Sequence, residues 1–503
     1  MAIQSLLILI SASLCFLAFP PLNSYWLQCI SLVPLLFLFH KSYLNCFQLP
    51  YFTQLRNLSL LGFIFGVVYM GLTNLWVFEL IEFSNLPKII CLFIIYTIYE
   101  AFFFGLIACC YRLCHCKAFL LPFIWIVFEW LKSYGPYGSP NGVLGYSQAN
   151  NILINHFASL GGVYAVSFIC VFISSLLFLT ILSITQKHHR RSFLYLFTII
   201  LILFSSHFYH LPSTSSPQTF NVASVQANHP MPYKFKRKNR AAIRQDYIQI
   251  SQDAIKQHKL DFIIWPETIT ASLNLNFKSL MSPIQTMTQH DTAFIFGSPR
   301  KENGHYYNTA AFITSKNRVT YDKIQLMPFG EYWPLKRVFQ FFKLDNIIPG
   351  SEFTHGKTPT LFDLNAIQIA PIICLESTNS CLSRTYANQG ADILVSLVNN
   401  AWFKGSSIAA RQLQMLQFRS IEVGLPSIQS ANMGFTCFIN ASGKITGILD
   451  KYQQDYLFQS IDCVSIDTPF RNWGNGIVLV AFIITLGYLL RSYYLYKYIL
   501  DKH

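Results

Sequence analysis

The chain has 503 residues, of which 52% are hydrophobic, 16% aromatic and only 12% charged. A soluble domain usually carries about twice that charged fraction, so the composition argues against a purely cytosolic protein. The excess of apolar residues also excludes an intrinsically disordered chain. Thirteen cysteines in so long a chain, several of them inside apolar runs, do not form the pattern of a disulfide scaffold. We therefore expect a membrane protein with a soluble part.

Apolar runs close to the roughly 20 residues that cross a bilayer define the membrane part. We expect seven spans over residues 1–210, a soluble domain over 211–475, and an eighth span followed by a tail over 476–503. The first run lacks a basic start, so we expect an anchor and not a cleaved signal peptide, with a re-entrant pair as the alternative for the first two runs. The runs are 3–18, 23–40, 58–78, 89–110, 118–131, 161–184, 193–209 and 476–492.

The positions of the basic residues indicate an orientation. With a cytoplasmic N-terminus, the inside loops and the tail hold ten Lys and Arg residues, and the outside loops hold only Lys88 and Lys132. This places residues 211–475 on the outer side of the membrane. The net charge of +14 is then a topology signal with minor contact to anionic lipid, and no nucleic-acid partner is expected. The ten inside residues are Lys41, Arg56, Arg112, Lys117, Lys187, Arg190, Arg191, Arg491, Lys497 and Lys502.

The soluble part alternates short β-rich runs with helical patterns at 238–258 and 407–423. Such alternation favours a layered α/β fold. The candidate strands are 220–226, 262–265, 293–296, 309–314, 367–373, 393–397, 427–431 and 436–439.

Three strand-like segments of this part end in a side chain that can take part in catalysis: Glu267, Lys323 and Cys374. A thiol nucleophile needs a base, and a desolvated carboxylate can serve as one. A nearby ammonium would depress the thiol pKa and stabilise an oxyanion. Each residue alone has an ordinary structural explanation, since a Cys after an apolar strand is usually a small buried residue and Lys323 could pair with Asp322. Their joint occurrence predicts an acyl-transfer site.

At these segments the sequence resembles the carbon–nitrogen hydrolase (nitrilase) superfamily, and the flanking apolar runs narrow the resemblance to the bacterial apolipoprotein N-acyltransferase family. The implied fold is a polytopic α-helical membrane protein of about eight spans with an inserted nitrilase-like α-β-β-α sandwich. The element Pro328–Glu331 within a multi-span frame is the most specific feature. Further similar motifs lie at 18–21, 32–35, 129–131, 144–148, 161–164, 225–228, 400–403, 419–422 and 473–474.

The resemblance implies a role for each matching residue. Glu267 would be the general base, Cys374 the nucleophile, and Lys323 the group that stabilises the tetrahedral intermediates. Glu331 would orient Lys323 or contact substrate, and Glu376 matches a required acidic position beside the nucleophile. Substrate-binding or supporting positions are Phe235, Leu375 and Trp402, while Asn308 is expected to be structural.

Several positions depart from the family pattern. Leu375 stands where the family has Tyr, and Phe235 where it has a gating Trp. Asn400 replaces an Asp before Ala-Trp-Phe, and Gln412 replaces a His. These changes leave the triad intact but affect the expected efficiency and substrate preference, because neighbouring groups hold a nucleophile in place. A catalytically impaired homologue is therefore an alternative.

The activity implied is transfer of the sn-1 acyl chain of a phospholipid, through a Cys thioester, to the α-amino group of an apolipoprotein's diacylglyceryl-cysteine. The donor would be phosphatidylethanolamine and the location the bacterial inner membrane, with a monomeric chain and no cofactor or metal. The loop 333–348 would dip toward lipid and cover an acyl pocket with Phe339, Phe341 and Phe342. Cys109, Cys110, Cys114, His115 and Cys116 match no standard zinc arrangement.

Two other functions stay open. A membrane-tethered amidase would use the same triad with water or a small amine. A transporter should have ionisable residues paired within its spans, and here only Glu100, Glu129 and Lys132 lie near span ends.

Overall fold

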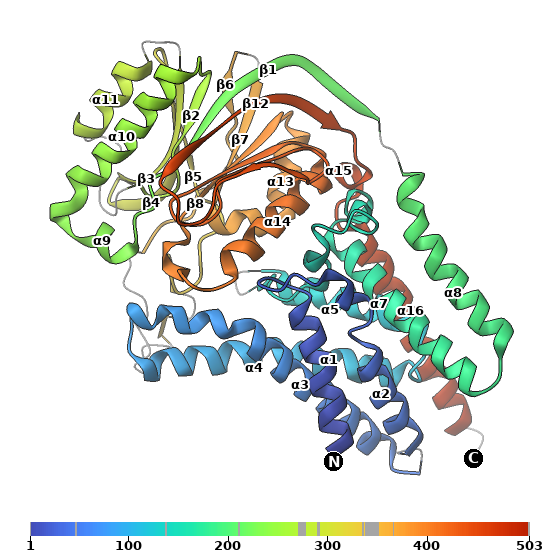
Figure 1. The fold of residues 1–503 in the computed structure, drawn as a ribbon. Coiled ribbons are helices and arrows are strands. Elements are labelled where there is room, and N and C mark those ends of the chain that lie inside the picture. The colour runs from blue at the N-terminus through green and yellow to red at the C-terminus, as the bar shows by residue number, and fades with distance from the viewer. Residues whose placement is uncertain are drawn as a thin grey trace. The chain divides into compact units, whose positions relative to one another are not determined.

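A computed structural model describes most of the chain as two compact units. A helical unit comprises Met1–Phe78, Leu86–His210 and Trp473–His503, and an α/β unit comprises Glu79–Asn85 and Leu211–Asn472. Figure 1 shows the fold of both. The described residues are 2–45, 48–135, 138–209, 212–269, 278–288, 292–333, 336–337, 352–365 and 367–500.

Each of the eight apolar runs coincides with a helix of the helical unit. Five helical segments of the described chain are long and apolar enough to cross a membrane: Tyr25–Asn45, Tyr51–Glu82, Leu86–Leu113, Val163–Thr185 and Gly476–Tyr494. The others are shorter; a helix of 13 residues is about 20 Å long against a hydrocarbon core of about 30 Å. The structure thus supports several membrane-spanning helices, and the count of eight spans stays a prediction. The helices are α1 (Ala2–Leu17), α2 (Val33–Asn45), α3 (Tyr51–Thr73), α4 (Leu86–Leu113), α5 (Leu121–Ser133), α6 (Ala158–Gly161), α7 (Val163–Thr185), α8 (His189–Phe204) and α16 (Gly476–Leu500).

Two ionisable residues of the helical unit form a buried ion pair that the sequence analysis did not predict. Lys132 Nζ on α5 lies 3.6 Å from Glu100 Oε1 on α4, and both side chains are buried. Asn74 Nδ2 donates to Glu100 Oε2 at 2.6 Å, and Lys132 donates to the carbonyls of Ser139 and Asn141 at 3.0 and 2.5 Å. These bonds tie the segment after α5 to α4 and α5, so the pair acts as an anchor for that segment.

The α/β unit contains two six-stranded sheets. In each sheet the central strands are parallel and the outer ones antiparallel: β1, β2 and β3 run parallel in the first, and β7, β8 and β9 in the second. The first sheet has the order β12 (Asp455–Ile466), β1 (Ser213–Gln226), β2 (Phe262–Ile264), β3 (Ala293–Glu302), β4 (His305–Ile313), β5 (Arg318–Asp322). The second has the order β11 (Ile445–Ile448), β10 (Cys437–Ile439), β9 (Ser427–Ala431), β8 (Ile393–Val398), β7 (Ile367–Ile373), β6 (Phe362–Leu364).

The two sheets pack face to face between layers of helices (Figure 1). Because side chains alternate along a strand, Phe262 and Ile264 belong to the core between the sheets, and Ile263 packs toward α10 (Arg240–Gln257) and α11 (Lys278–Thr288). Helices α13 (Ser380–Asn388) and α14 (Ile408–Val423) cover the second sheet with apolar residues such as Leu382 and Leu416. The expected α-β-β-α sandwich is therefore present.

The site-bearing segments begin where these strands end. Short elements follow them: α9 (Met231–Phe235) after β1, η8 (Cys374–Thr378) after β7 and η9 (Asn400–Phe403) after β8. The carboxyl ends of parallel strands lie at the same edge of their sheet, so residues distant in sequence meet there. Helix α15 (Pro469–Trp473) lies at the end of the α/β unit.

Candidate active site

The structure brings together the three residues predicted as a triad. Glu267 follows β2, Lys323 follows β5 directly, and Cys374 follows β7 directly. Lys323 Nζ lies 3.5 Å from Glu267 Oε1, and the charges of both groups act on the nearby Cys374 thiol. A carboxylate, an ammonium and a half-buried thiol therefore share one site, whereas their catalytic roles stay predictions.

Lys323 is held between two carboxylates. Its side chain is 1% exposed, and Nζ lies 2.8 Å from Glu331 Oε2 as well as near Glu267. Asn308 joins the same pair, because its Nδ2 donates to Glu267 Oε1 at 2.8 Å and to Glu331 Oε1 at 2.6 Å. Burial alone would lower the pKa of Lys323, but Glu331 and then Glu267 outweigh it and hold this pKa above its ordinary value. The ammonium is thus available to stabilise an oxyanion.

Glu267 has the environment of a general base. Burial raises its pKa above the ordinary value of a carboxyl group, and Lys323 opposes that rise. The backbone N–H of Asn399 donates to Oε2 at 3.1 Å. A carboxylate with a raised pKa whose charge acts on the thiol is a suitable acceptor for its proton.

Cys374 occupies a tight turn between β7 and η8. Its φ is +51°, in the left-handed region that non-glycine residues rarely adopt, and Gln412 Nε2 donates to its carbonyl at 2.8 Å. Burial and, next, the charge of Glu267 raise the pKa of Cys374 to about 12, while Lys323 lowers it only in part. The expected lowering by Lys323 is present, but burial and Glu267 outweigh it, so attack by the thiol requires a base.

Glu376 supports the site through hydrogen bonds on both of its carboxylate oxygens. It is 0% exposed. Its Oε1 accepts from the hydroxyl of Tyr321 at 2.7 Å and from the N–H groups of Ile324 and Gln325 at 2.7 and 3.0 Å, and Oε2 accepts from Ile373 N at 2.8 Å. It thereby ties the Tyr321 side chain and the backbone after Lys323 to the strand that precedes Cys374.

Three aromatic rings form a row near η9. Phe235, at the end of α9 and 44% exposed, lies 5.7 Å from Trp402 between ring centroids. Trp402 in turn lies 4.8 Å from Phe83, which belongs to the α/β unit although it precedes α4 in the chain. Leu375 is half-buried beside the nucleophile. Phe339, Phe341 and Phe342, with most of the loop 333–348, lie outside the described residues.

Two asparagines contact the carboxylates of the site, and the sequence analysis did not single out one of them, Asn399. Asn308 was expected to be structural, and it contacts both carboxylates of the site. Asn399 precedes the Asn400-Ala-Trp-Phe motif, which was the one signal that could have indicated it. Among the described residues, no group of His, Cys, Asp or Glu side chains is arranged to hold a metal ion.

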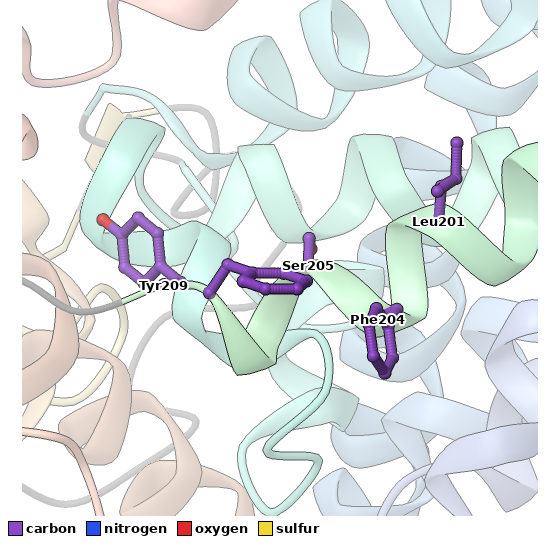
Figure 2. Close-up of a pocket in the computed structure, with 5 residues that line it drawn as sticks. Leu201, Phe204, Ser205 and Tyr209 are labelled. Atoms are coloured by element: carbon purple, nitrogen blue, oxygen red, sulfur yellow. The ribbon is translucent and has the colours of Figure 1, made fainter.

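A hollow of about 360 Å³ lies in the helical unit, on α8 and the following turn. Figure 2 shows that its lining is aromatic and aliphatic with a single serine. It contains no nucleophile paired with a base, so we do not assign the reaction to it. Its residues are Leu201, Phe204, Ser205, Phe208 and Tyr209.

The fold and the buried Glu, Lys and Cys define the class: residues 221–468 match the family model described as "Carbon-nitrogen hydrolase". Residues 11–176 match a second model, "Apolipoprotein N-acyltransferase N-terminal domain". Together the two matches cover most of the chain, which belongs to the apolipoprotein N-acyltransferase family.

Several curated proteins with that name are similar to this chain. The apolipoprotein N-acyltransferase of Coxiella burnetii is 26% identical, over 96% of this chain and 99% of its own length. The protein of Pseudomonas putida is 28% identical over 73% of this chain and 73% of its own length. That of Geobacter metallireducens is 26% identical over 70% of this chain and 70% of its own length. A solved carbon–nitrogen hydrolase from Helicobacter pylori G27 is 16% identical with a TM-score of 0.38, covering 49% of this chain and 90% of its own; the family assignment does not depend on it.

Proposed function

We propose that this enzyme transfers the sn-1 acyl chain of a phospholipid, through a thioester on Cys374, to the α-amino group of the diacylglyceryl-cysteine that begins an apolipoprotein. The observation that carries the proposal is the grouping of Cys374, Glu267 and Lys323 at one site, in a chain whose first part matches the apolipoprotein N-acyltransferase model and whose α/β part matches the carbon–nitrogen hydrolase model. Phosphatidylethanolamine is the proposed donor.

The first half-reaction forms the thioester. Glu267 accepts the thiol proton as the sulfur of Cys374 attacks the ester carbonyl, and the carbonyl oxygen becomes an oxyanion opposite Lys323. The C–O bond to the glycerol then breaks, and the proton held by Glu267 passes to the leaving alkoxide. The products are an acyl-enzyme and a lysophospholipid, and Glu267 is ionised again.

The second half-reaction consumes the thioester. The α-amino group of the lipoprotein attacks the acyl carbon, and Glu267 accepts the proton that the amine loses. Collapse of the intermediate breaks the C–S bond, and the proton returns to sulfur. A thioester suits this role because an amine cleaves it readily, while the acyl group is kept from water in a buried site.

The membrane location follows from the substrates. Donor and acceptor are both lipid-anchored, which gives a physical reason for joining apolar helices to a hydrolase-like unit. We propose that the chain resides in the bacterial inner membrane as a monomer, with the α/β unit on the periplasmic side, as the distribution of Lys and Arg predicts.

The test uses membranes that contain the full chain, with acyl-labelled phosphatidylethanolamine and a diacylated lipopeptide. The wild type should form a labelled enzyme, from which neutral hydroxylamine releases the labelled acyl group. It should then form a triacylated product. Cys374→Ala should form neither, with a loss of at least about 10³-fold. Cys381→Ala is the matched control, because Cys381 is an exposed cysteine on α13 of the same unit.

The outcomes separate the alternatives. Equal product from wild type and Cys374→Ala would remove Cys374 from the mechanism. Free fatty acid without triacylated lipopeptide would indicate the amidase-like alternative, in which water resolves the thioester. A labelled enzyme that never transfers its acyl group would indicate an impaired homologue.

A further inference from the structure

Lys234 is a fully buried amine beside the proposed base. It lies on α9 and is 0% exposed, and its Nζ donates to the carbonyl of Thr268 at 2.6 Å. Thr268 directly follows Glu267 and has a φ of +47°, in the left-handed region. The amine therefore holds the backbone carbonyl of the residue that follows the base, where the positive φ is unfavourable for a β-branched residue.

The burial of this amine is costly. Among the residues that the structure describes, Lys234 forms no ion pair, and a buried charge without a close partner is strongly destabilising. A methionine of similar length would fill the same space at lower cost. Fold stability alone thus gives no reason for a lysine here. The turn at Thr268, which follows Glu267, does give a reason.

Helix α9 reaches Glu267 by two routes. The first runs through Lys234 and Thr268. The second runs through Met231, whose sulfur accepts from Asn399 Nδ2 at 3.4 Å, and the backbone N–H of Asn399 donates to the Glu267 carboxylate. Both flanks of the base are therefore fixed by the same short helix.

We propose that Lys234 is a positioning residue for Glu267: its bond to Thr268 fixes the backbone that carries the carboxylate, and its positive charge favours the ionised form of that carboxylate. The proposal rests on the proposed role of Glu267 as the base. Lys234 touches neither the thiol nor the ester in this scheme.

The charges around the two groups determine the sign of the effect. Glu267 also faces Lys323, Glu331 and Cys374. Burial lowers the pKa of Lys234 to about 7, and Glu267 opposes this by raising it. The positive charge of Lys234 is therefore greater on the acid side of pH 7, where it favours the ionised form of Glu267. On its other side Lys234 faces His229, whose Nε2 lies 3.2 Å from Asp246 of α10.

Lys234→Met removes the charge and the donor, whereas Lys234→Gln removes the charge and keeps a donor. Without the charge, the first proton lost by the Glu267–Cys374 pair should leave at a higher pH. We expect the acid limb of the pH–rate profile to move up by about one unit in both variants, which is about tenfold slower reaction on that limb. Lys234→Met alone should also lower the plateau rate.

The experiment measures alkylation of Cys374 by iodoacetamide against pH in the full-length protein, quantified on the Cys374 peptide by mass spectrometry. Thioester formation from labelled phosphatidylethanolamine is followed in parallel. Lys236→Met is the matched control, because it removes the same charge from an exposed side chain two residues away.

Alkylation and acylation separate the two proposals. A shifted alkylation profile in both Lys234 variants but not in Lys236→Met supports the inference, even where no acyl transfer occurs and the proposed function fails. Profiles that superimpose on the wild type overturn it, even where acyl transfer is confirmed. If Lys234→Met does not fold, Lys234→Gln decides by the same criterion.

Discussion

At the scale of single residues, the site depends on the way one ammonium is shared. Lys323 is paired with Glu267 and more closely with Glu331, and Asn308 bridges the two carboxylates. The second carboxylate leaves Lys323 charged while Glu267 accepts a proton. A site with Glu267 alone would lose its counter-charge at the moment of proton transfer.

Glu331→Gln tests this arrangement. The amide has one oxygen for three donors, namely Lys323 Nζ, Asn308 Nδ2 and the backbone N–H of Met327 at 2.7 Å. We expect Lys323 to move toward Glu267 and single-turnover acylation to fall about 100-fold, the usual effect of losing one oxyanion donor. Glu352→Gln, at an exposed carboxylate paired with Lys336, should leave the rate unchanged. An unaltered rate in Glu331→Gln would show that Lys323 needs only Glu267.

At the scale of elements, the base depends on the close approach of β3 to the loop after β2. Gly297 N donates to the carbonyl of Pro266 at 3.1 Å, and Ile269 N donates to the carbonyl of Gly297 at 3.1 Å. A Cβ at position 297 would lie 2.6 Å from the Cα of Glu267, closer than such atoms approach. Glycine is therefore required here by space and not by backbone conformation.

Gly297→Ala should displace the Glu267 backbone. We expect acylation to fall about tenfold or more, since small misplacements of a catalytic group are costly, and the free energy of unfolding to drop by about 1–3 kcal/mol. Gly487→Ala is the control, because a Cβ there meets nothing within 4 Å. Unchanged acylation in Gly297→Ala, measured under single-turnover conditions, would mean that the loop relaxes without moving the carboxylate.

Some strands were missed by sequence analysis for physical reasons. The short β5 and β6 lie at the ends of the two sheets, and β5 has exposed or half-buried residues apart from Tyr321, so neither carries the apolar run of a central strand. The long β12 is mostly half-buried, and Asp, Gln and Ser interrupt its apolar residues. The central strands β2, β7 and β8 were predicted because all of their residues except Gln368 are buried, which makes each a nearly continuous apolar run.

At the scale of the whole molecule, the chain contributes to the α/β unit twice. Glu79–Asn85 lies between helices α3 and α4 in sequence but belongs to the α/β unit. There Phe83 contacts Trp402, and Lys404 Nζ lies 3.0 Å from Glu82 Oε1. This ion pair is exposed and contributes at most about 1 kcal/mol, so the aromatic contact is the more substantial link.

The predicted orientation can be measured with an impermeant maleimide on intact spheroplasts. Cys381 is exposed on the α/β unit, so we expect its labelling before lysis, quantified on its own peptide. Cys109, which the orientation places at the cytoplasmic end of α4, should react only after lysis, and Cys381→Ser controls for the peptide assignment. Labelling of Cys381 only after lysis would reverse the topology and end the proposed access to outer-leaflet substrates.

Sequence alone determined the apolar helices, the α/β alternation and the three residues at strand ends, because hydrophobic periodicity and strand termination are local properties of a chain. Only the tertiary structure decided that Asn308 bridges two carboxylates, that Glu376 accepts from the backbone of two separate segments, and that Lys234 lies against the turn after Glu267. Those contacts arise where two sheets and a short helix meet, and no spacing along one segment encodes them.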